Sequence, residues 1–166
     1  LESVLSQSFQ DFELIIVDDM SVDATERILD QYARRDHRIR VLRNQTRRGL
    51  TRNLNRALQE AKGEYLARLD ADDLMAPERL AQQVAYLDAH PECSLLGSAV
   101  SLIDEKGTSI GQWRGGQDAA LLRWKAISVN PLTHGSVMLR HSFLIQYHLT
   151  YNESFEVSQD YELWLR

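Results

Sequence analysis

The sequence predicts an α/β fold in which a mainly parallel sheet carries helices on both faces. Short apolar runs alternate with stretches that repeat apolar residues at helical spacing. Three strand-then-helix segments in a row are typical of such sheets, because each helix carries the chain back to start the next parallel strand. The strands are predicted at residues 12–17, 39–42 and 65–69, and the helices at residues 24–34, 49–62 and 77–89.

Local signals mark the ends of these elements. Ser21 or Asp23 offers an N-cap for the first predicted helix. Gly49 opens the second helix, and Gly63 is a natural stop for it. Pro77 suits the first turn of the third helix, because its fixed φ is helical and no backbone donor is lost there.

The second half of the chain is predicted to contain a longer strand and several shorter elements. Turn signals stand at residues 106–107 and 115–116. Asp118 is placed to cap a helix over residues 119–127. The remaining elements are a strand at 93–103, a strand at 136–139, a short helix at 141–147, a final helix that opens at Gln159 or Asp160, and the end of a helix at 1–7.

Composition narrows the class of protein. The chain has 166 residues, enough for one domain with a real core, and 43% hydrophobic with 26% charged residues is typical of a globular protein. A net charge of -5 argues against a nucleic-acid partner. The single cysteine, Cys93, excludes an internal disulfide. Both ends fall inside helical patterns, so we expect a segment of a longer cytoplasmic protein, whose association with the inner face of a membrane would use regions outside this segment.

Acidic residues follow two of the predicted strands. Parallel sheets bind ligands at the carboxyl ends of their strands, where Asp18 and Asp19 and the run Asp70–Asp73 fall. Three carboxylates within four residues repel one another unless water or a cation screens them. Mg²⁺ and Mn²⁺ take oxygen ligands and often only one or two protein carboxylates, with substrate phosphates completing the shell. The alternative is a solvated loop whose carboxylates cap the following helices.

Five segments share an ordered pattern with known proteins, at residues 9–23, 49–57, 61–73, 77–80 and 159–164. Together these segments resemble family 2 glycosyltransferases, the group with the GT-A fold. The resemblance implies a Rossmann-like, three-layer α/β/α domain over residues 1–166, with a nucleotide-sugar donor half at 1–103 and an acceptor half at 104–166. It also implies that the chain is truncated at both ends, with the family's first strand lying before Leu1.

The resemblance assigns donor-binding roles to particular residues. Asp18 or Asp19 would contact the nucleotide base, usually uracil in this family. Asp72 would be the metal-binding end of the Asp-x-Asp motif, and Asp70 would share the Mn²⁺ or Mg²⁺ and lie close to the donor sugar. Asp73 would assist as a further carboxylate. Arg52 is the weakest of these assignments, as a contact to the diphosphate.

The resemblance also implies a reaction. Asp160 would be the general base that takes a proton from the acceptor hydroxyl. The sugar of a nucleotide-diphosphate sugar, a UDP-sugar by analogy, would pass with inversion to a glycan or lipid-linked acceptor during surface polysaccharide or lipopolysaccharide synthesis. His134 stands where relatives often carry histidine, and a structural or rim role is favoured for it.

Two departures from the family pattern stand inside the site segments. Relatives usually have glycine where this chain has Met20, and because methionine takes a positive φ only at a cost, the turn after Asp19 is expected to differ. Gln159 replaces a frequent glutamate before Asp160, which leaves the proposed base intact.

Two alternatives remain open at this point. A receiver-like phosphoacceptor domain also has an acidic pair after its first strand, and Asp70 would then be the phosphorylated residue. Against it, the only late lysines, Lys106 and Lys125, fit a turn and a helix and not a late strand. The second alternative is a non-catalytic nucleotide-binding module of the same fold.

Overall fold

The computed structural model describes residues 1–116 and 118–166, and it divides into two compact units. Unit 1 contains residues 1–10 and 65–146 together with Leu165. Unit 2 contains residues 11–64 and 147–164 together with Arg166.

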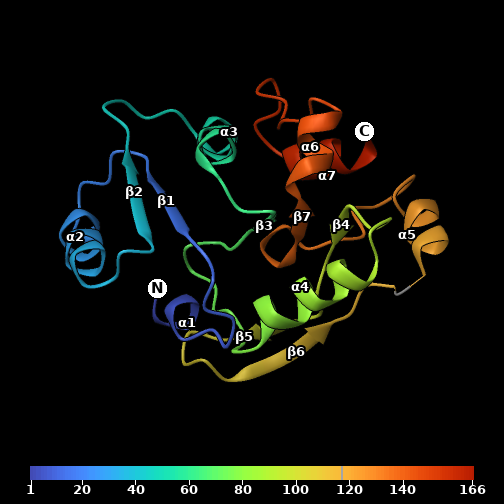
Figure 1. Cartoon of the computed structure of the whole chain (residues 1–166), viewed down its shortest axis with the longest axis horizontal. Coiled ribbons are helices and arrows are strands. Elements are labelled where there is room, and N and C mark those ends of the chain that lie inside the picture. Colours follow the sequence, from blue (N-terminus) through green and yellow to red (C-terminus); the bar gives the residue numbers. More distant parts are fainter. Residues whose placement is uncertain (117) are drawn as a thin grey trace. The chain divides into compact units, whose positions relative to one another are not determined.

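Unit 2 is built on a pair of parallel strands. Strand β1 (Leu14–Asp18) and strand β2 (Ile39–Arg43) pair in register from Leu14 opposite Ile39 to Asp18 opposite Arg43. Helix α2 (Thr25–Arg35) packs on β2, helix α3 (Leu50–Glu60) packs on β1, and the two helices lie on opposite sides of the strand pair (Figure 1). The predicted alternation of strand and helix is therefore confirmed for this part of the chain.

The last part of unit 2 in the sequence contacts α3. Residues 147–158 form an irregular segment that leads into helix α7 (Gln159–Leu165). Tyr151 from this segment and Leu163 from α7 are buried, as are Leu29 of α2 and Ile39 of β2. These side chains supply the apolar contacts that hold unit 2 together.

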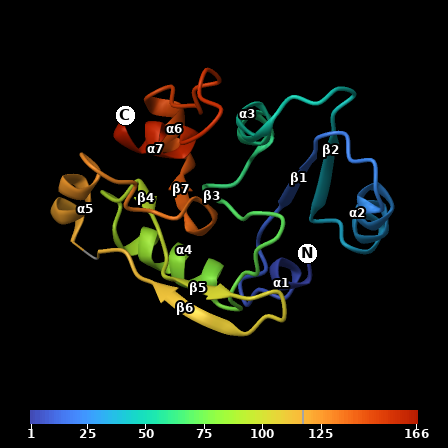
Figure 2. The ribbon, with the colours of Figure 1, turned by 180° about the vertical axis from the view of Figure 1, so that it is seen from behind.

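Unit 1 is built on a short antiparallel sheet. Strand β7 (Met138–Arg140) lies between β3 (Tyr65–Ala67) and β4 (Leu95–Leu96) and is antiparallel to both (Figure 2). The flanking elements are α1 (Glu2–Leu5), α4 (Arg79–Ala89), the short 3-10 helix η1 (His134–Ser136) and α6 (His141–Gln146). The core of this unit includes Leu87, Val137, Met138 and Leu139, none of them more than 6% exposed.

The direction of pairing differs between the two units. Among the described strands, only β1 and β2 pair in parallel, so the mainly parallel sheet expected from the sequence is found in unit 2 and not in unit 1. Strand β7 enters from η1 and runs straight into α6, and this connection sets it opposite to β3 and β4. An apolar run predicts that a strand exists, but the connection decides its direction.

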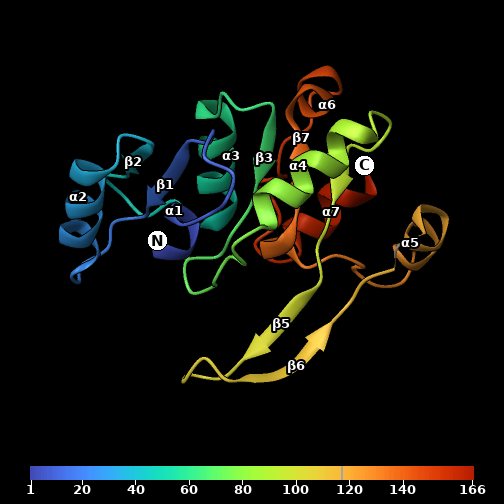
Figure 3. The same cartoon turned by 60° about the horizontal axis from the view of Figure 1, so that its bottom comes forward.

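The single strand expected at residues 93–103 is wrong, because two strands occupy this stretch. Strand β4 pairs with β7, whereas β5 (Val100–Ile103) forms a separate hairpin with β6 (Ser109–Trp113), which the sequence did not predict (Figure 3). The chain leaves the first sheet at Gly97, where an added Cβ would lie only 2.8 Å from Leu132 Cδ2. Glycine avoids this crowding at the point between the two strands.

Several predicted helix signals are confirmed. The carboxylate of Asp118 accepts hydrogen bonds from the backbone N–H groups of Ala120 (2.8 Å) and Leu121 (3.0 Å) at the start of α5 (Ala119–Lys125). Gly49 precedes α3 with a φ of 82°, a conformation that favours glycine. None of the helices within residues 1–116 and 118–166 combines the length and apolar character needed to cross a bilayer.

Candidate functional site

The end of β1 brings the two predicted base-contacting carboxylates to different surroundings. Asp18 is buried, at 7% exposure, and its Oδ1 accepts a hydrogen bond from the backbone N–H of Ser21 at 3.0 Å. Asp19 accepts three hydrogen bonds: Oδ1 from Asn44 Nδ2 (2.7 Å) and from Arg48 N–H (2.8 Å), and Oδ2 from Gly49 N–H (2.9 Å). Asp19 therefore anchors the loop that leads into α3.

The pKa of Asp19 reflects this anchoring. Burial alone would raise the pKa of this carboxyl group, but the donors from Arg48, Asn44 and Gly49 outweigh it and lower the pKa to about 2. A carboxylate that accepts several backbone N–H bonds stays ionised because each donor stabilises the charged form. Most of the acceptor capacity of Asp19 is used inside the protein, which a base contact would have to share.

The turn after Asp19 keeps a left-handed residue although glycine is absent. Met20 has a φ of 65° and a side chain that is 48% exposed. Methionine therefore takes the positive φ here despite its cost, and a difference from the turn in relatives stays a prediction. The carboxylate of Asp18, bonded to Ser21 N–H across Met20, helps to hold the backbone there.

The acidic run follows β3 in unit 1, and two of its carboxylates converge on one glycine. A Cβ added to Gly135 would lie 2.7 Å from Asp73 Oδ2 and 3.0 Å from Asp70 Oδ2. Gly135 itself is buried, and Asp70 also forms an ion pair with Arg68. Asp72 is exposed. The absence of a side chain at Gly135 leaves these oxygens room beside the backbone of η1.

Electrostatics at this loop favour an added positive charge. Burial, and then the neighbouring charges of Asp70 and Asp72, raise the pKa of Asp73. Arg68 and Arg79 act in the opposite direction without reversing the shift. Like charges this close penalise the ionised form, and a cation relieves that penalty.

A buried arginine joins the backbone just before the acidic run to the backbone around η1. Arg79 is 8% exposed and donates from Nη1 to Gly135 O (2.9 Å) and from Nη2 to Arg68 O (2.8 Å) and Val137 O (3.1 Å). Gln83 accepts from Arg79 Nε at 3.0 Å. Burial lowers the pKa of Arg79 to about 10, so this group remains a cation at neutral pH.

The residues present fit a hard divalent cation. No three His, Cys, Asp or Glu side chains gather in a metal-holding group within the ranges 1–116 and 118–166. Mg²⁺ and Mn²⁺ nevertheless bind through one or two carboxylates together with water and substrate phosphates. Asp70 and Asp73 bring carboxylate oxygens of this kind together beside Gly135, and Asp72 offers an exposed one. The role of Asp70 and Asp72 as metal ligands stays a prediction.

The other predicted site residues lie in unit 2. Arg52 projects from α3, and its Nε donates to Glu153 Oε2 at 3.2 Å. Asp160 is in the first turn of α7 and is partly buried. Residues of α3, namely Thr51, Arg52 and Asn55, contact the segment that leads to Asp160. Asp18, Asp19, Arg52 and Asp160 thus belong to unit 2, and Asp70 and Asp72 belong to unit 1.

Comparison with known proteins identifies the family. The model of glycosyl transferase family 2 matches residues 1–148, which is most of the chain. The chain belongs to glycosyl transferase family 2. The receiver-like alternative is thereby excluded, and the resemblance seen in the sequence is confirmed.

Proteins with similar sequences include two that are described as glycosyltransferases. A protein described as glycosyltransferase EpsE of Bacillus subtilis (strain 168) is 39% identical over 145 residues, covering 86% of this chain and 50% of that protein. A protein described as the teichuronic acid biosynthesis glycosyltransferase TuaG of the same organism is 36% identical over 113 residues, covering 68% of this chain and 44% of that protein. The chain spans about half the length of these relatives.

Solved structures of glycosyltransferases show the fold. The TarS fragment 1-349 of S. aureus, in complex with UDP, has a TM-score of 0.72 at 22% identity and covers 98% of this chain and 48% of that chain. The mannosyltransferase PcManGT of Pyrobaculum calidifontis, in complex with GDP-Man and Mn²⁺, also has a TM-score of 0.72, at 20% identity, and covers 98% of this chain and 45% of that chain. This family 2 chain therefore has the GT-A fold.

Sequence reasoning missed the residues that support these side chains. Asn44 and Asn55 are buried amides, and neither a motif nor a charge pattern marks them. Gly135 was passed over in favour of its neighbour His134, which lies in η1. A signal was present for Arg79, because a basic residue within an amphipathic helix whose neighbours are buried needs internal acceptors.

Proposed function

We propose that this chain is the donor-binding and catalytic part of a metal-dependent glycosyltransferase. It would transfer a sugar from a nucleotide-diphosphate sugar, with UDP as the favoured nucleotide, to a hydroxyl group of a glycan or lipid-linked acceptor. Inversion at the anomeric carbon and a role in surface polysaccharide synthesis belong to the same proposal, as does catalysis on the cytoplasmic face of a membrane. The observation that carries it is the convergence of Asp70 and Asp73 on Gly135 in a chain of family 2.

The acidic loop would serve the diphosphate. Asp72 and Asp70 would hold Mn²⁺ or Mg²⁺, which when bound supplies Lewis-acid stabilisation of the charge on the departing nucleotide diphosphate. Arg79 fixes the backbone beside the loop, where Asp70 and Asp73 converge on Gly135, and Asp73 would assist as a further carboxylate. The complexes of PcManGT with GDP-Man and Mn²⁺ and of TarS with UDP support ligands of this class by analogy.

The residues of unit 2 would serve the base and the acceptor. Asp18 and Asp19 would lie beside the nucleotide base, with Asp19 chiefly fixing the loop before α3. Asp160 would accept the proton of the acceptor hydroxyl as that oxygen attacks the sugar. A diphosphate contact by Arg52 would have to compete with its ion pair to Glu153.

A transfer assay on the full-length parent protein tests the proposal. UDP-sugars and GDP-mannose are supplied one at a time with Mn²⁺ and a glycan acceptor panel, and nucleotide release and product are measured. Replacing Asp160→Asn should lower kcat by about 100-fold or more, because proton transfer loses its acceptor. The matched control Glu156→Gln neutralises an exposed carboxylate in the preceding segment and should leave kcat unchanged.

The outcomes separate the proposal from the remaining alternative. Nucleotide binding without turnover by any donor would favour the non-catalytic module. A product that retains the anomeric configuration, read by NMR, would contradict the inverting mechanism while leaving the donor assignment standing.

A further inference from the structure

We infer that Thr51 and Asn55 are positioning residues that hold the segment Tyr151–Phe155 and thereby fix Asp160, the proposed base. The inference rests on the proposed function, which assigns Asp160 as the general base. All of these residues belong to unit 2, so the contacts lie within one compact part of the molecule.

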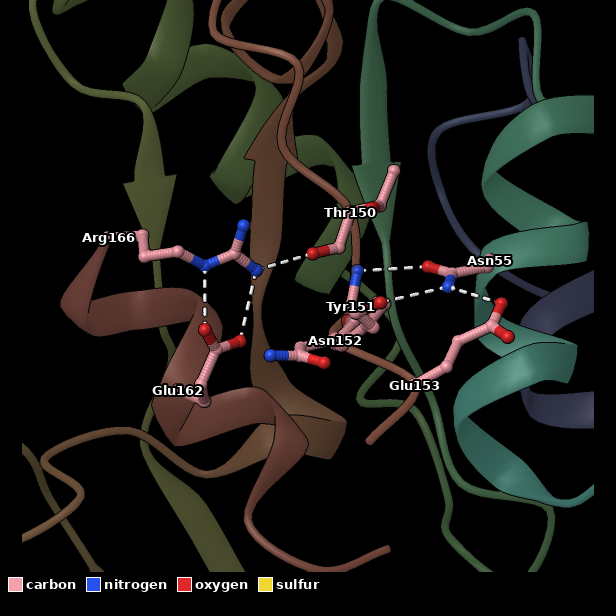
Figure 4. Close-up of a pocket in the computed structure, with 7 residues that line it drawn as sticks. All are labelled: Asn55, Thr150, Tyr151, Asn152, Glu153, Glu162 and Arg166. Carbon is pink, nitrogen blue, oxygen red and sulfur yellow. Dashed lines mark hydrogen bonds and ion pairs between the residues drawn. The ribbon is translucent and has the colours of Figure 1, made fainter. Parts of the chain in front are cut away.

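The side-chain amide of Asn55 bonds both backbone groups of Tyr151, its N–H and its C=O. Asn55 Nδ2 donates to Tyr151 O at 2.9 Å, and Tyr151 N–H donates to Asn55 Oδ1 at 2.9 Å (Figure 4). Asn55 and Tyr151 are only 7% and 3% exposed. Buried hydrogen bonds of this kind are costly to lose, because neither partner can turn to water.

Further hydrogen bonds from α3 hold the segment at Glu153 and Phe155. Asn55 Nδ2 also donates to Glu153 Oε1 at 3.1 Å, while Arg52 Nε donates to Glu153 Oε2 at 3.2 Å. Hydrogen bonds from Asn55, and then from Arg52, lower the pKa of Glu153 and keep it ionised. Thr51, itself 7% exposed, donates its hydroxyl to Phe155 O at 2.9 Å.

The position fixed at Phe155 passes to Asp160 over a short stretch of chain. Only residues 156–158 separate Phe155 from α7. Ser158 enters the helix with a φ of 58°, a restricted conformation, and Gln159 and Leu163 bury one face of α7. Because the stretch is short, a shift of the segment at α3 should be passed on to the first turn of α7.

The contacts belong to one face of one helix. Thr51 and Asn55 are four residues apart on α3 and therefore adjacent on its surface. The segment beyond them borders a polar pocket of about 410 Å³, whose opposite side is formed by Glu162 and Arg166 of α7 (Figure 4). Because α3 also packs on β1, its hydrogen bonds to the segment connect the segment to the strand pair of unit 2.

The experiment combines hydrogen exchange with kinetics on the full-length parent. Asn55→Ala should raise amide exchange in peptides covering residues 147–160 and should lower kcat by up to about 100-fold, with KM for the donor changed little. Gln59→Ala, one turn further along α3 and exposed, is the matched control and should change neither readout. Thr51→Val should act like Asn55→Ala to a smaller degree, and Thr51→Ser, which keeps the hydroxyl, should retain more activity than Thr51→Val.

Three results would contradict the positioning role of Asn55 or the proposed function. Unchanged exchange over residues 147–160 in Asn55→Ala would show that Asn55 does not hold the segment and would overturn the inference alone. Faster exchange with an unchanged kcat would show that the segment does not position the base. A wild-type parent without any transferase activity would overturn the proposed function, and the catalytic half of this inference with it, whatever the exchange shows.

Discussion

Met20 takes a left-handed backbone conformation, which glycine adopts far more readily than methionine. A side chain at positive φ brings Cβ close to the backbone and costs about 1–2 kcal/mol. With 48% of the side chain exposed, little packing compensates for that strain. The residue is kept in place by the surrounding bonds, above all the one from Ser21 N–H to Asp18.

We therefore expect Met20→Gly to stabilise the protein. The gain should be about 0.5–1 kcal/mol, because relief of the strain exceeds the extra chain entropy of glycine in the unfolded state. Urea unfolding of the two proteins measures it. The control Val22→Gly, at an exposed residue of the same loop without positive φ, should lose stability instead; a loss in both variants would contradict the strain argument.

Asp19 makes stability depend on pH. Its pKa in the folded protein is about 2, below the value of about 3.9 for a free aspartate. A lowered pKa means that the ionised group stabilises the fold above about pH 4, and that this stabilisation is lost as the pH falls toward 2. Asp19→Asn should therefore cost about 1–2 kcal/mol at pH 7, and the difference from wild type should shrink between about pH 4 and 2. Urea titrations across that range would refute the assignment if the difference stayed constant.

The missing side chain of Gly135 leaves room for the carboxylates of Asp70 and Asp73. Since the φ of Gly135 is not in the left-handed region, alanine fits the backbone, and the only collision is with the ends of Asp70 and Asp73. Gly135→Ala should cost less than about 1 kcal/mol of stability, because these side chains can turn away.

Moving those carboxylates should impair ligand binding. We expect the affinity for UDP with Mn²⁺ to fall by about tenfold, equivalent to about 1.4 kcal/mol, as measured by calorimetry on the full-length parent. Gly111→Ala is the matched control, because its added Cβ would meet only Leu102 Cδ1 at an ordinary 3.6 Å. Equal affinities for both variants and wild type would remove Asp70 and Asp73 from the donor site.

At the scale of single elements, periodicity was sufficient to locate the helices, but most of the predicted end signals were wrong. The N-cap of α2 is Ala24 and not Ser21 or Asp23, α3 ends at Glu60 before Gly63, and α4 begins at Arg79, after Pro77. Helices α2, α3 and α4 lie within a few residues of the predicted ranges, and Asp118 caps α5 as expected. These signals are local, so they can be read from neighbouring residues. Asp23 also supports the start of α2, where its Oδ1 accepts from Thr25 N–H at 2.9 Å.

Strands were harder to predict because their partners are distant in sequence. The apolar stretch around residues 93–103 reads as one strand, yet β4 and β5 join different sheets. Gly97 lies between the two strands and is approached by Leu132, from 35 residues further along the chain, a contact that a local pattern does not reveal. Likewise, the parallel order held for β1 and β2, which one helix connects, and failed for β3, whose neighbour β7 follows much later.

For the whole molecule, motif order was the strongest information in the sequence. Asp18, Asp19, Arg52, Asp70, Asp72 and Asp160 were all chosen from segments that resemble family 2, and the family itself is confirmed. Their roles stay predictions. The supporting residues, Asn44, Asn55 and Arg79, act through buried contacts to backbone atoms, and such contacts exist only once the chain has folded.

The donor assignment predicts how the whole protein responds to ligand. A ligand that binds only the folded state stabilises it by about 2.7 kcal/mol at 100 times its Kd, which is a shift of several degrees in Tm. UDP with Mn²⁺ should therefore raise the Tm of the full-length parent, and UDP with EDTA should raise it less. Asp72→Ala should abolish the Mn²⁺-dependent part of the shift by removing an oxygen ligand, whereas Glu92→Gln, at an exposed carboxylate after α4, should keep it. If Asp72→Ala retained the full shift, the cation would have to be held elsewhere, and the acidic loop would revert to a solvated turn before α4.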